Sequence, residues 1–425
     1  MNKLNVYVEI QGKNTLIGHI DVNNDQGMFS YEEEYLQNPN SSPISISLPL
    51  EEKTFNEQRT KTFFDGLLPE GFTRRCVAGW MHKEETDYLS ILAGLGRECL
   101  GAVKIIATDD NSDTFYYQKM TNEEVKRLAQ EGATESAELV TKSHLSLTGA
   151  SGKVGLYYNE KNKDWYLPVG NAPSTHIVKQ SHIRLKNIVA NEQLCLLTAK
   201  FLGIEVPNSF IIRTEGDDKE DVLFATSRYD RKITASGEKW NDMTIPYRLH
   251  QEDFAQALGI SSAEKYEQNN AGYLQKMFAV LRNYSSHPIE DQLKLWNICI
   301  FNYLIGNTDN HIKNLSLLYS ENLKVIKLAP AYDIISTIVY ESSTDHMAIS
   351  IGDSYRLTDI TRESFEKEAM KDGLGKNIAM RQFDKMVSEF KDALYSAGKI
   401  LQKQGFKIDY IQKEILLKGG ISKYI

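Results

Sequence analysis

One short stretch of the C-terminal half holds the residues best suited to chemistry. Asp309 is followed five positions later by Asn314, and Asp333 lies nineteen residues beyond Asn314. A kinase needs this order, because the first Asp orients the attacking hydroxyl while the Asn and the second Asp hold the metal ions that neutralise the phosphates. Oxygen ligands of this kind suit Mg²⁺. The sequence therefore predicts a phosphoryl-transfer site, with Asp309 as the catalytic residue and Asn314 and Asp333 as Mg²⁺ ligands.

Two further polar residues, His311 and Lys313, lie inside the same loop. Lys313 could stabilise charge on the transferring phosphoryl group, and His311 could contact phosphate. A structural histidine that braces the loop is an equal alternative. The loop is flanked by the mainly apolar segments 303–305 and 315–317, and polar groups between buried segments need partners, which Mg²⁺ and ATP would supply. We therefore count both residues as candidate ATP ligands.

A candidate phosphate-binding loop spans residues 146–153. Its two glycines and small side chains would let backbone N–H groups approach phosphate oxygens, although a plain hairpin turn is the alternative. Ser151, Gly152 and Lys153 are the candidate ligands within it. Lys179 ends a short apolar strand and could also reach the ATP phosphates, the alternative being a surface lysine.

Three more candidate ATP ligands lie between the strand-rich and the helical parts of the chain. Arg228 and Tyr229 are placed where a kinase hinge would bind adenine, and Gln251 follows near the expected cleft. Asp253, two residues later, has a second interpretation as the N-terminal cap of a helix.

The periodicity of apolar residues predicts the elements that must position this site. We expect an N-terminal domain at 1–106, a connector at 107–143 with little core of its own, a β lobe at 144–230 and a helical catalytic lobe at 231–425. The expected strands are 4–10, 15–22, 27–31, 44–50, 154–158, 165–168, 175–179, 210–213 and 222–229. The expected helices are a mostly helical stretch that follows residue 71 and ends at about residue 95, and then 122–131, 187–202, 253–258, 271–282, 289–304, 361–368, 380–404 and 408–418.

Composition limits the class of protein. The net charge of −8 argues against a broad electrostatic grip on nucleic acid. The four cysteines are far apart and form no CxxC pair, which favours reduced thiols in a cytosolic protein. The N-terminus lacks a signal-peptide core, and no apolar stretch approaches the roughly 18–20 residues of a membrane span. We expect a cytoplasmic protein without a membrane partner.

Taken together, these motifs resemble the HipA family, bacterial serine/threonine kinases that act as toxins of toxin–antitoxin pairs. The resemblance covers nearly the whole chain. The residues that carry it are 63–70, 96–102, 146–153, 175–179, 191–192, 229–231, 251–253, Asp309–His311–Lys313–Asn314 and 332–336.

The resemblance implies an α+β, two-lobed, protein-kinase-like fold related to lipid kinases, with an N-terminal β-rich subdomain. It implies ATP and Mg²⁺ as cofactors, Asp309 as the catalytic residue, and Lys179 as a contact to the ATP phosphates. Ser146 falls where family members phosphorylate their own phosphate loop, which switches the kinase off because a dianionic group cannot share a cradle built for ATP. Thr148 adds a possible second site.

The resemblance also implies partners. Family toxins phosphorylate an aminoacyl-tRNA synthetase, most familiarly the glutamyl enzyme, and so arrest translation. They bind a small helix-turn-helix antitoxin, HipB-like, through which they contact DNA indirectly. Two alternatives stay open on the sequence: a nucleotide-binding, non-catalytic regulator that acts with a DNA-binding antitoxin, and a small-molecule kinase on the same scaffold.

Overall fold

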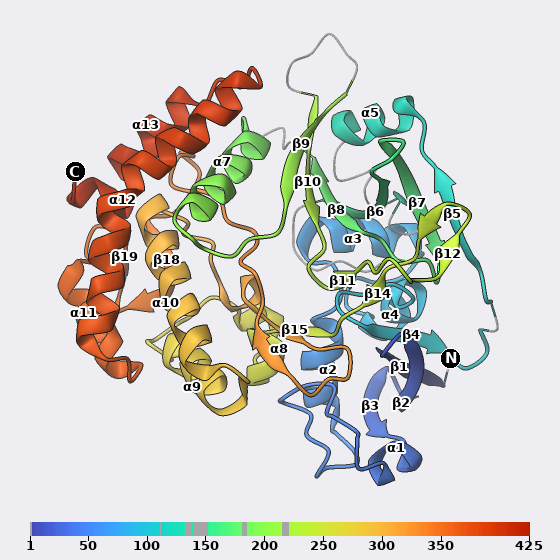
Figure 1. The fold of residues 1–425 in the computed structure, drawn as a ribbon. Helices are drawn as coiled ribbons and strands as arrows, with labels where there is room; N and C mark the ends of the chain where they lie inside the picture. The colour runs from blue at the N-terminus through green and yellow to red at the C-terminus, as the bar shows by residue number, and fades with distance from the viewer. Residues whose placement is uncertain (1, 111, 132–137, 140–151, 181–184, 215–220) are drawn as a thin grey trace. The chain divides into compact units, whose positions relative to one another are not determined.

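The computed structural model describes residues 2–110, 112–131, 138–139, 152–180, 185–214 and 221–425. The chain divides into two compact units, and Figure 1 traces it through both. Unit 1 consists of Met1–Ser181, Ile212–Ser262 and Leu318–Val325, and unit 2 of His182–Ile211, Ala263–Leu317 and Ile326–Ile425.

Unit 1 begins with the predicted antiparallel meander, extended by one later strand. The four-stranded sheet has the order β3-β2-β1-β4. The alternation of β1 buries Leu4, Val6 and Val8, as a sheet with one core-facing side requires. Its strands are β1 (Lys3–Ile10), β2 (Lys13–Asn23), β3 (Gln26–Tyr31) and β4 (Val103–Ala107), and α1 (Glu33–Gln37), α2 (Glu57–Asp65), α3 (Gly71–Trp80) and α4 (Tyr88–Leu95) lie between β3 and β4 in the chain.

The strand predicted over 44–50 is wrong. This segment forms turns, with one isolated bridge between Ser45 and Leu48. Pro43 precedes it and Pro49 lies within it, and because proline has no backbone N–H, each of these positions removes one donor that a regular ladder would use.

The second sheet of unit 1 carries the predicted β lobe. Its strands run in the order β5-β7-β6-β8-β10 (Figure 1), and β9 (Ser209–Arg213) is the strand over which the chain returns to unit 1. The strands are β5 (Phe115–Lys119), β6 (Lys153–Asn159), β7 (Asp164–Gly170), β8 (His176–Gln180) and β10 (Val222–Ser227).

The segment expected to be a connector contributes to this sheet. β5 pairs antiparallel with β7, and the buried ring of Tyr117 packs 4.7 Å from that of Tyr157, measured between ring centroids. The helix predicted next to it is confirmed as α5 (Asn122–Glu131). β5 therefore shares a core with the β lobe, which agrees with a connector that packs on a neighbouring element.

Residues 231–253 also differ from the expected helical lobe. They form short strands rather than helix, and the first helix after them is α8 (Phe254–Leu258). Asp253 caps that helix, since its side chain accepts from the backbone N–H of Gln256 while Gln256 returns a bond to Asp253. The strands are β11 (Arg231–Lys232), β12 (Lys239–Trp240), β13 (Met243–Thr244), β14 (Tyr247–Arg248) and β15 (Gln251–Asp253).

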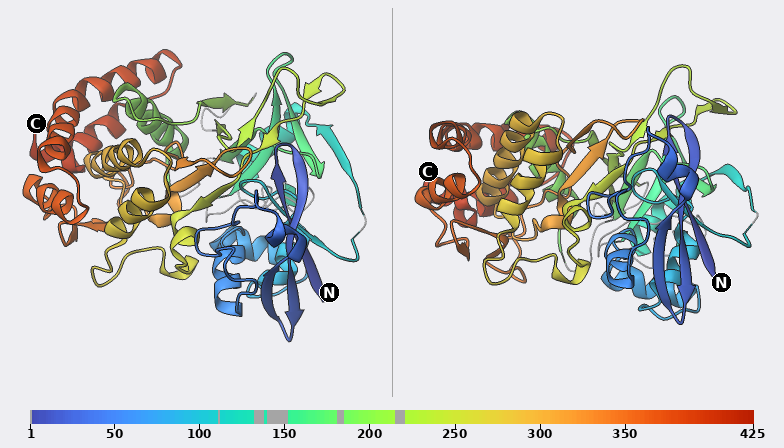
Figure 2. Two further views of the ribbon diagram at one scale, coloured as in Figure 1. Left: turned by 60° about the horizontal axis from the view of Figure 1, so that its bottom comes forward. Right: turned by 90° about the horizontal axis from the view of Figure 1, so that it is seen from below.

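Unit 2 is mainly helical, as predicted (Figure 2). α12 packs on both α7 and α10, and Trp296, Phe365 and Phe383 are fully or almost fully buried between helices. None of the described helices is long and apolar enough to cross a membrane. The helices are α7 (Ile188–Phe201), α9 (Tyr273–Tyr284), α10 (Pro288–Ile305), α11 (Arg362–Lys371), α12 (Lys376–Lys403) and α13 (Asp409–Lys418), with strands β17 (Ile326–Leu328), β18 (His346–Ile351) and β19 (Ser354–Arg356); β16 (Ser316–Tyr319) continues from unit 2 into unit 1.

A buried acid in unit 2 makes stability depend on pH. The carboxylate of Asp372 is 2% exposed and accepts no hydrogen bond from the described residues. Burial, followed by the charge of Glu368, raises the pKa of Asp372 to about 9. The folded chain thus keeps a proton that the unfolded chain releases above about pH 4, so stability falls as pH rises from about 4 to about 9.

We expect Asp372→Asn to raise the free energy of unfolding by more than about 1 kcal/mol at about pH 8, and by much less near pH 4. Urea unfolding at the two pH values measures this difference. Asp359→Asn, at an exposed position of unit 2, is the matched control. Equal stabilisation at both pH values would show that Asp372 is ionised in the folded protein.

Candidate active site

The loop that carries Asp309 begins where α10 ends. Gly306 has φ +67°, and a Cβ at this position would lie 2.4 Å from Cγ2 of Ile338, so both backbone conformation and space require glycine. The Gly306 carbonyl accepts from the backbone N–H of Ile338 and the hydroxyl of Thr337. α10 therefore delivers the chain into the loop at a fixed point.

Hydrogen bonds within the loop fix Asp309 and Asn314 relative to each other. The Asn314 side-chain amide donates to the backbone carbonyl of Asp309 at 2.9 Å, and the backbone N–H of His311 donates to the same carbonyl at 2.8 Å. The Asp309 N–H is in turn bound by Oδ1 of Asn307 at 3.2 Å. Asp309 is exposed. The loop thus presents this carboxylate to solvent on a backbone that is held at both ends.

The segment that carries Asp333 is tied to the same loop. The hydroxyl of Tyr332 donates to the Lys313 carbonyl at 2.9 Å and lies 2.6 Å from that of Ser316. Four residues after Asp333, the hydroxyl of Thr337 accepts from the backbone N–H of Thr308 at 2.7 Å. Unit 2 therefore brings together the segments of all three residues predicted from the sequence to bind metal and substrate.

Asp333 itself has φ +52°, a left-handed conformation that aspartate and asparagine adopt more readily than most residues other than glycine. Just beyond it, Asn191 of α7 donates to the carbonyl of Ser336 at 2.8 Å and accepts from its N–H at 3.3 Å. Asn191 therefore fixes the backbone three residues after Asp333. The side chain of Asp333 is only partly buried.

The residues present fit an ATP-bound Mg²⁺ ion. Within the described residues, no group of three or more His, Cys, Asp or Glu side chains could hold a metal. Mg²⁺ does not need one, because in kinases it is bound by one or two protein oxygens together with the substrate phosphates. The amide nitrogen of Asn314 makes the loop contact, which leaves its amide oxygen as the atom that could hold the ion. ATP and Mg²⁺ stay predictions.

The two other loop residues are buried. His311 is 6% exposed and Lys313 is 5% exposed. The ring of His311 meets that of Tyr266 edge-on, with the centroids 5.1 Å apart. The alternative of a histidine that braces the loop thus gains support, and a contact of either residue with ATP stays a prediction.

In unit 1, the structure sets two of the predicted phosphate ligands opposite each other. Lys153 on β6 and Lys179 on β8 are direct partners in the antiparallel ladder, so their side chains share one face of the sheet. Directly opposed like charges destabilise a strand pair unless an anion lies near them. The Lys179 ammonium also lies 5.5 Å from the centroid of the Phe224 ring. Gly152 next to this pair is buried.

The hydroxyls predicted to accept phosphate, Ser146 and Thr148, lie outside the described residues, as does Ser151. The predicted phosphorylation of Ser146 and Thr148 and the predicted contact of Ser151 with ATP therefore stay predictions.

The side chain of Arg228 belongs to a buried ionic cluster. Its five N–H donors are taken by both oxygens of Asp230, Glu98 Oε1, the hydroxyl of Ser174 and the carbonyl of Cys99. The guanidinium has no exposed surface. This favours a structural role over the contact with ATP predicted from the sequence.

The remaining two predicted ligands border that cluster. Tyr229 donates its hydroxyl to Oε1 of Gln251, whose amide nitrogen lies 3.4 Å from Asp230. Gln251 is 6% exposed and Tyr229 is partly exposed. Tyr229 is therefore the more accessible of the pair, and its contact with ATP stays a prediction.

Sequence reasoning missed one residue that touches the candidate catalytic group. The hydroxyl of Tyr266 donates to Oδ1 of Asp309 at 2.5 Å. Tyr266 lies in a polar loop before α9, where neither spacing nor periodicity marks it. Thr337 and Thr308, which join the two loops, were also missed, because a single threonine gives no pattern in the sequence.

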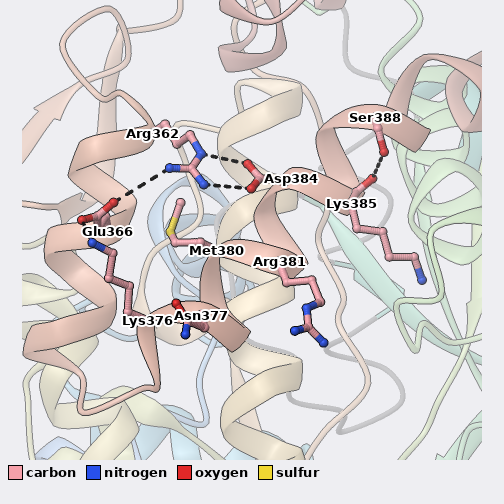
Figure 3. Close-up of a pocket in the computed structure, with 9 residues that line it drawn as sticks. All are labelled: Arg362, Glu366, Lys376, Asn377, Met380, Arg381, Asp384, Lys385 and Ser388. Atoms are coloured by element: carbon pink, nitrogen blue, oxygen red, sulfur yellow. Dashed lines mark hydrogen bonds and ion pairs between the residues drawn. The ribbon is translucent and has the colours of Figure 1, made fainter.

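A second part of unit 2, on α11 and α12, contains a cavity lined mainly by charged residues (Figure 3). Its volume is about 560 Å³, and four of its six charged lining residues pair with one another, whereas Arg381 and Lys385 pair with none of the other lining residues. Arg362 makes two 2.8 Å bonds to Asp384, and Lys376 pairs with Glu366. These four groups satisfy each other and show no arrangement for catalysis, so the Asp309 loop stays the candidate for the chemistry.

Two family models match the chain. The one described as the HipA-like C-terminal domain covers residues 145–394, and the one described as the HipA N-terminal domain covers residues 8–106. The candidate kinase Y4mE of Sinorhizobium fredii is 29% identical over 375 residues, which is 86% of this chain and 85% of that protein. The serine/threonine-protein kinase toxin HipA of Shewanella oneidensis is 25% identical over 369 residues, 83% of this chain and 80% of the toxin.

A solved structure has the same fold. The Shewanella oneidensis complex of HipA, HipB and operator DNA contains a chain that superposes with a TM-score of 0.81 at 21% identity, covering 99% of this chain and 97% of that one. The predicted fold class, α+β and kinase-like, is confirmed by this match.

Proposed function

Because the chain belongs to the HipA family of kinase toxins, we propose that it transfers the γ-phosphate of ATP to serine or threonine of a protein. One observation carries the proposal: unit 2 joins the segments of Asp309, Asn314 and Asp333 by hydrogen bonds. Asp309 would orient the acceptor hydroxyl and accept its proton, while Asn314 and Asp333 would hold Mg²⁺, which neutralises the phosphates.

The proposed ATP contacts from unit 1 are Lys153 and Lys179. Their direct opposition in the β6–β8 ladder supports this proposal, because it places both side chains on one face of the sheet, where two lysines could bind the phosphates of one nucleotide. The small residues of 146–152 would add backbone N–H donors.

We further propose that the protein is a cytoplasmic toxin that arrests translation by phosphorylating an aminoacyl-tRNA synthetase, the glutamyl enzyme first. A small helix-turn-helix antitoxin would neutralise it and provide the contact with DNA. The support is family membership, together with the solved HipA complex, which contains HipB and operator DNA.

The test is peptide mapping by mass spectrometry after incubation of the full chain with Mg·ATP. We expect one phosphate per chain within residues 146–151, on Ser146 first and Thr148 second, and none when EDTA replaces Mg²⁺. Phosphate that appears without Mg²⁺ would contradict the roles of Asn314 and Asp333. Binding of ATP without any transfer, either to the chain or to added protein, would favour the non-catalytic regulator.

A further inference from the structure

Asn191 belongs to one of the motifs that carry the family resemblance, but the proposed function assigns it no role. It lies near the start of α7, and its side chain is fully buried. A buried amide destabilises the fold unless its donors and acceptors are hydrogen-bonded. The partners of Asn191 therefore indicate what this residue holds in place.

The side-chain amide of Asn191 is bound at both ends. Its nitrogen donates to the Ser336 carbonyl at 2.8 Å and to the hydroxyl of Tyr340 at 3.2 Å. Its oxygen accepts from the backbone N–H of Ser336 at 3.3 Å and from the thiol of Cys195 at 3.4 Å. Both donors and both lone pairs of the amide are thus used within the protein. One side chain holds both backbone groups of Ser336, as a neighbouring strand would hold them.

Ser336 is also joined to the end of α10. Its hydroxyl donates at 2.6 Å to the carbonyl of Ile305, the last residue of that helix. The next residue, Thr337, accepts at 2.7 Å from the backbone N–H of Thr308, which directly precedes Asp309. The segment that follows the candidate Mg²⁺ ligand is therefore fixed to the start of the candidate catalytic loop.

Asp333 lies on a segment that needs such partners. Residues 331–337 form neither helix nor strand, so no regular ladder of backbone hydrogen bonds holds them. A ligand of Mg²⁺ must be placed closely, because the ion demands near-ideal octahedral geometry with oxygens at about 2.0–2.1 Å. Ser336 is three residues from Asp333, so a shift of its backbone would displace the carboxylate.

We propose that Asn191 is a positioning residue for Mg²⁺, and that through Ser336 it sets the place of the Asp333 carboxylate relative to the Asp309 loop. This inference rests on the proposed kinase function. It adds a residue of α7, outside both loops, on which the affinity for the ion depends. Asn191 acts through the backbone of Ser336 and not as a ligand, since its amide is occupied by groups of the protein.

Asn191→Leu tests this role, because leucine has nearly the size of asparagine but forms no hydrogen bond with Ser336. The measurement is the dissociation constant of the full chain for ATP, as Mg²⁺ is titrated and in EDTA. We expect the variant to need about 10–100-fold more Mg²⁺ for half of its effect on ATP binding, the usual cost of losing a partner that orients a metal ligand. The dissociation constant in EDTA should stay within about twofold of the wild type.

The matched control is Gln412→Met. Gln412 is a buried amide of α13 that donates to the Leu394 carbonyl at 2.9 Å, and methionine has nearly its shape. This variant also removes a buried side-chain hydrogen bond in unit 2, so it should lower stability as well. Its requirement for Mg²⁺ should equal that of the wild type.

Asn191→Asp gives a second measurement that does not depend on the fold of the leucine variant. A protonated aspartic acid can donate to the Ser336 carbonyl and accept from its N–H, whereas the ionised form can only accept and repels that carbonyl. Burial raises the pKa of such a carboxyl, so the Mg²⁺ affinity of the variant should fall at least tenfold from about pH 6 to about pH 8.5. The wild type should change much less, because burial raises the pKa of both Cys195 and Tyr340 to about 12.

The outcomes separate this inference from the proposed function. Wild-type protein that binds ATP equally in Mg²⁺ and in EDTA would contradict the metal roles of Asn314 and Asp333, and the role of Asn191 with them. A wild type that depends on Mg²⁺, with both Asn191 variants equal to it, would overturn the positioning role alone. Weaker ATP binding by Asn191→Leu in EDTA as well as in Mg²⁺ would show a general disturbance of unit 2 and would also overturn it.

Discussion

Asp309→Asn is expected to lower phosphate transfer by a factor of about 10²–10⁴, the usual contribution of a positioned general base. The amide has nearly the shape of the carboxylate, but it cannot take the proton of the acceptor hydroxyl. The folded state should change little, because Asp309 is exposed, its contacts within the loop are made by its backbone, and the side-chain oxygen of an Asn could still accept from the hydroxyl of Tyr266. The measurement is the initial rate of transfer to a serine peptide at saturating ATP, beside the dissociation constant for ATP.

The loss should appear in kcat, with ATP binding within a fewfold of the wild type, because the affinity for ATP is assigned to other residues. Asp392→Asn is a suitable control, since Asp392 is an exposed carboxylate on α12 of the same unit. Equal transfer rates in the Asp309→Asn variant and the wild type would remove Asp309 from the catalytic role. A parallel loss in the control would point instead to a general effect of lost negative charge.

The sequence predicted the regular elements well where one periodicity dominates. The meander of β1 to β3 and the helices from α9 to α13 appear close to the expected positions, because each buries one regular face. The predictions failed where distant residues decide the structure. The segment 44–50 contains Pro49 and follows Pro43, which weaken a ladder there, and β5 exists because β7 supplies its partners from 47 to 55 residues away.

The candidate site shows the same division. The order Asp309, Asn314, Asp333 could be read directly, because the chemistry of phosphoryl transfer fixes residue types along the chain. The burial of Arg228 in an ionic cluster could not be predicted from the sequence. Its partner Glu98 is 130 residues away, and the cluster that encloses Arg228 exists in the folded state alone. Tyr266 was missed for the same reason: its contact with Asp309 spans 43 residues.

The buried cluster in unit 1 shows how the fold that surrounds the candidate ligands is held. Three arginines, Arg228, Arg231 and Arg248, donate to the carboxylate of Glu98 at 2.8 to 3.1 Å. Glu98 is 1% exposed, and the three guanidinium groups hold its pKa far below the usual range despite its burial. Asp230 and Glu9 supply the other two carboxylates, so three positive and three negative groups balance.

Glu98→Gln would leave these three guanidinium groups with two carboxylates in a region closed to water. We therefore expect it to lower the free energy of unfolding by about 3–5 kcal/mol, the usual cost of removing one partner from a buried ion pair. Urea unfolding at neutral pH, with an unchanged slope against urea concentration, measures this loss. The contrasting variant is Asp384→Asn, which breaks the exposed pair with Arg362 and should cost no more than about 1 kcal/mol.

A small loss in both variants would mean that water reaches the guanidinium groups once Glu98 is neutral, and that the cluster is less enclosed than its burial indicates. If Glu98→Gln alone shows a large loss of stability and also binds ATP more weakly, the buried cluster is linked to the candidate ATP contact of unit 1. Arg228 lies one residue from Tyr229 and donates twice to Asp230, so a disturbed cluster would move the backbone that carries the candidate adenine contact. The cluster would then act on ATP through the position of Tyr229, without any arginine of the cluster touching the nucleotide.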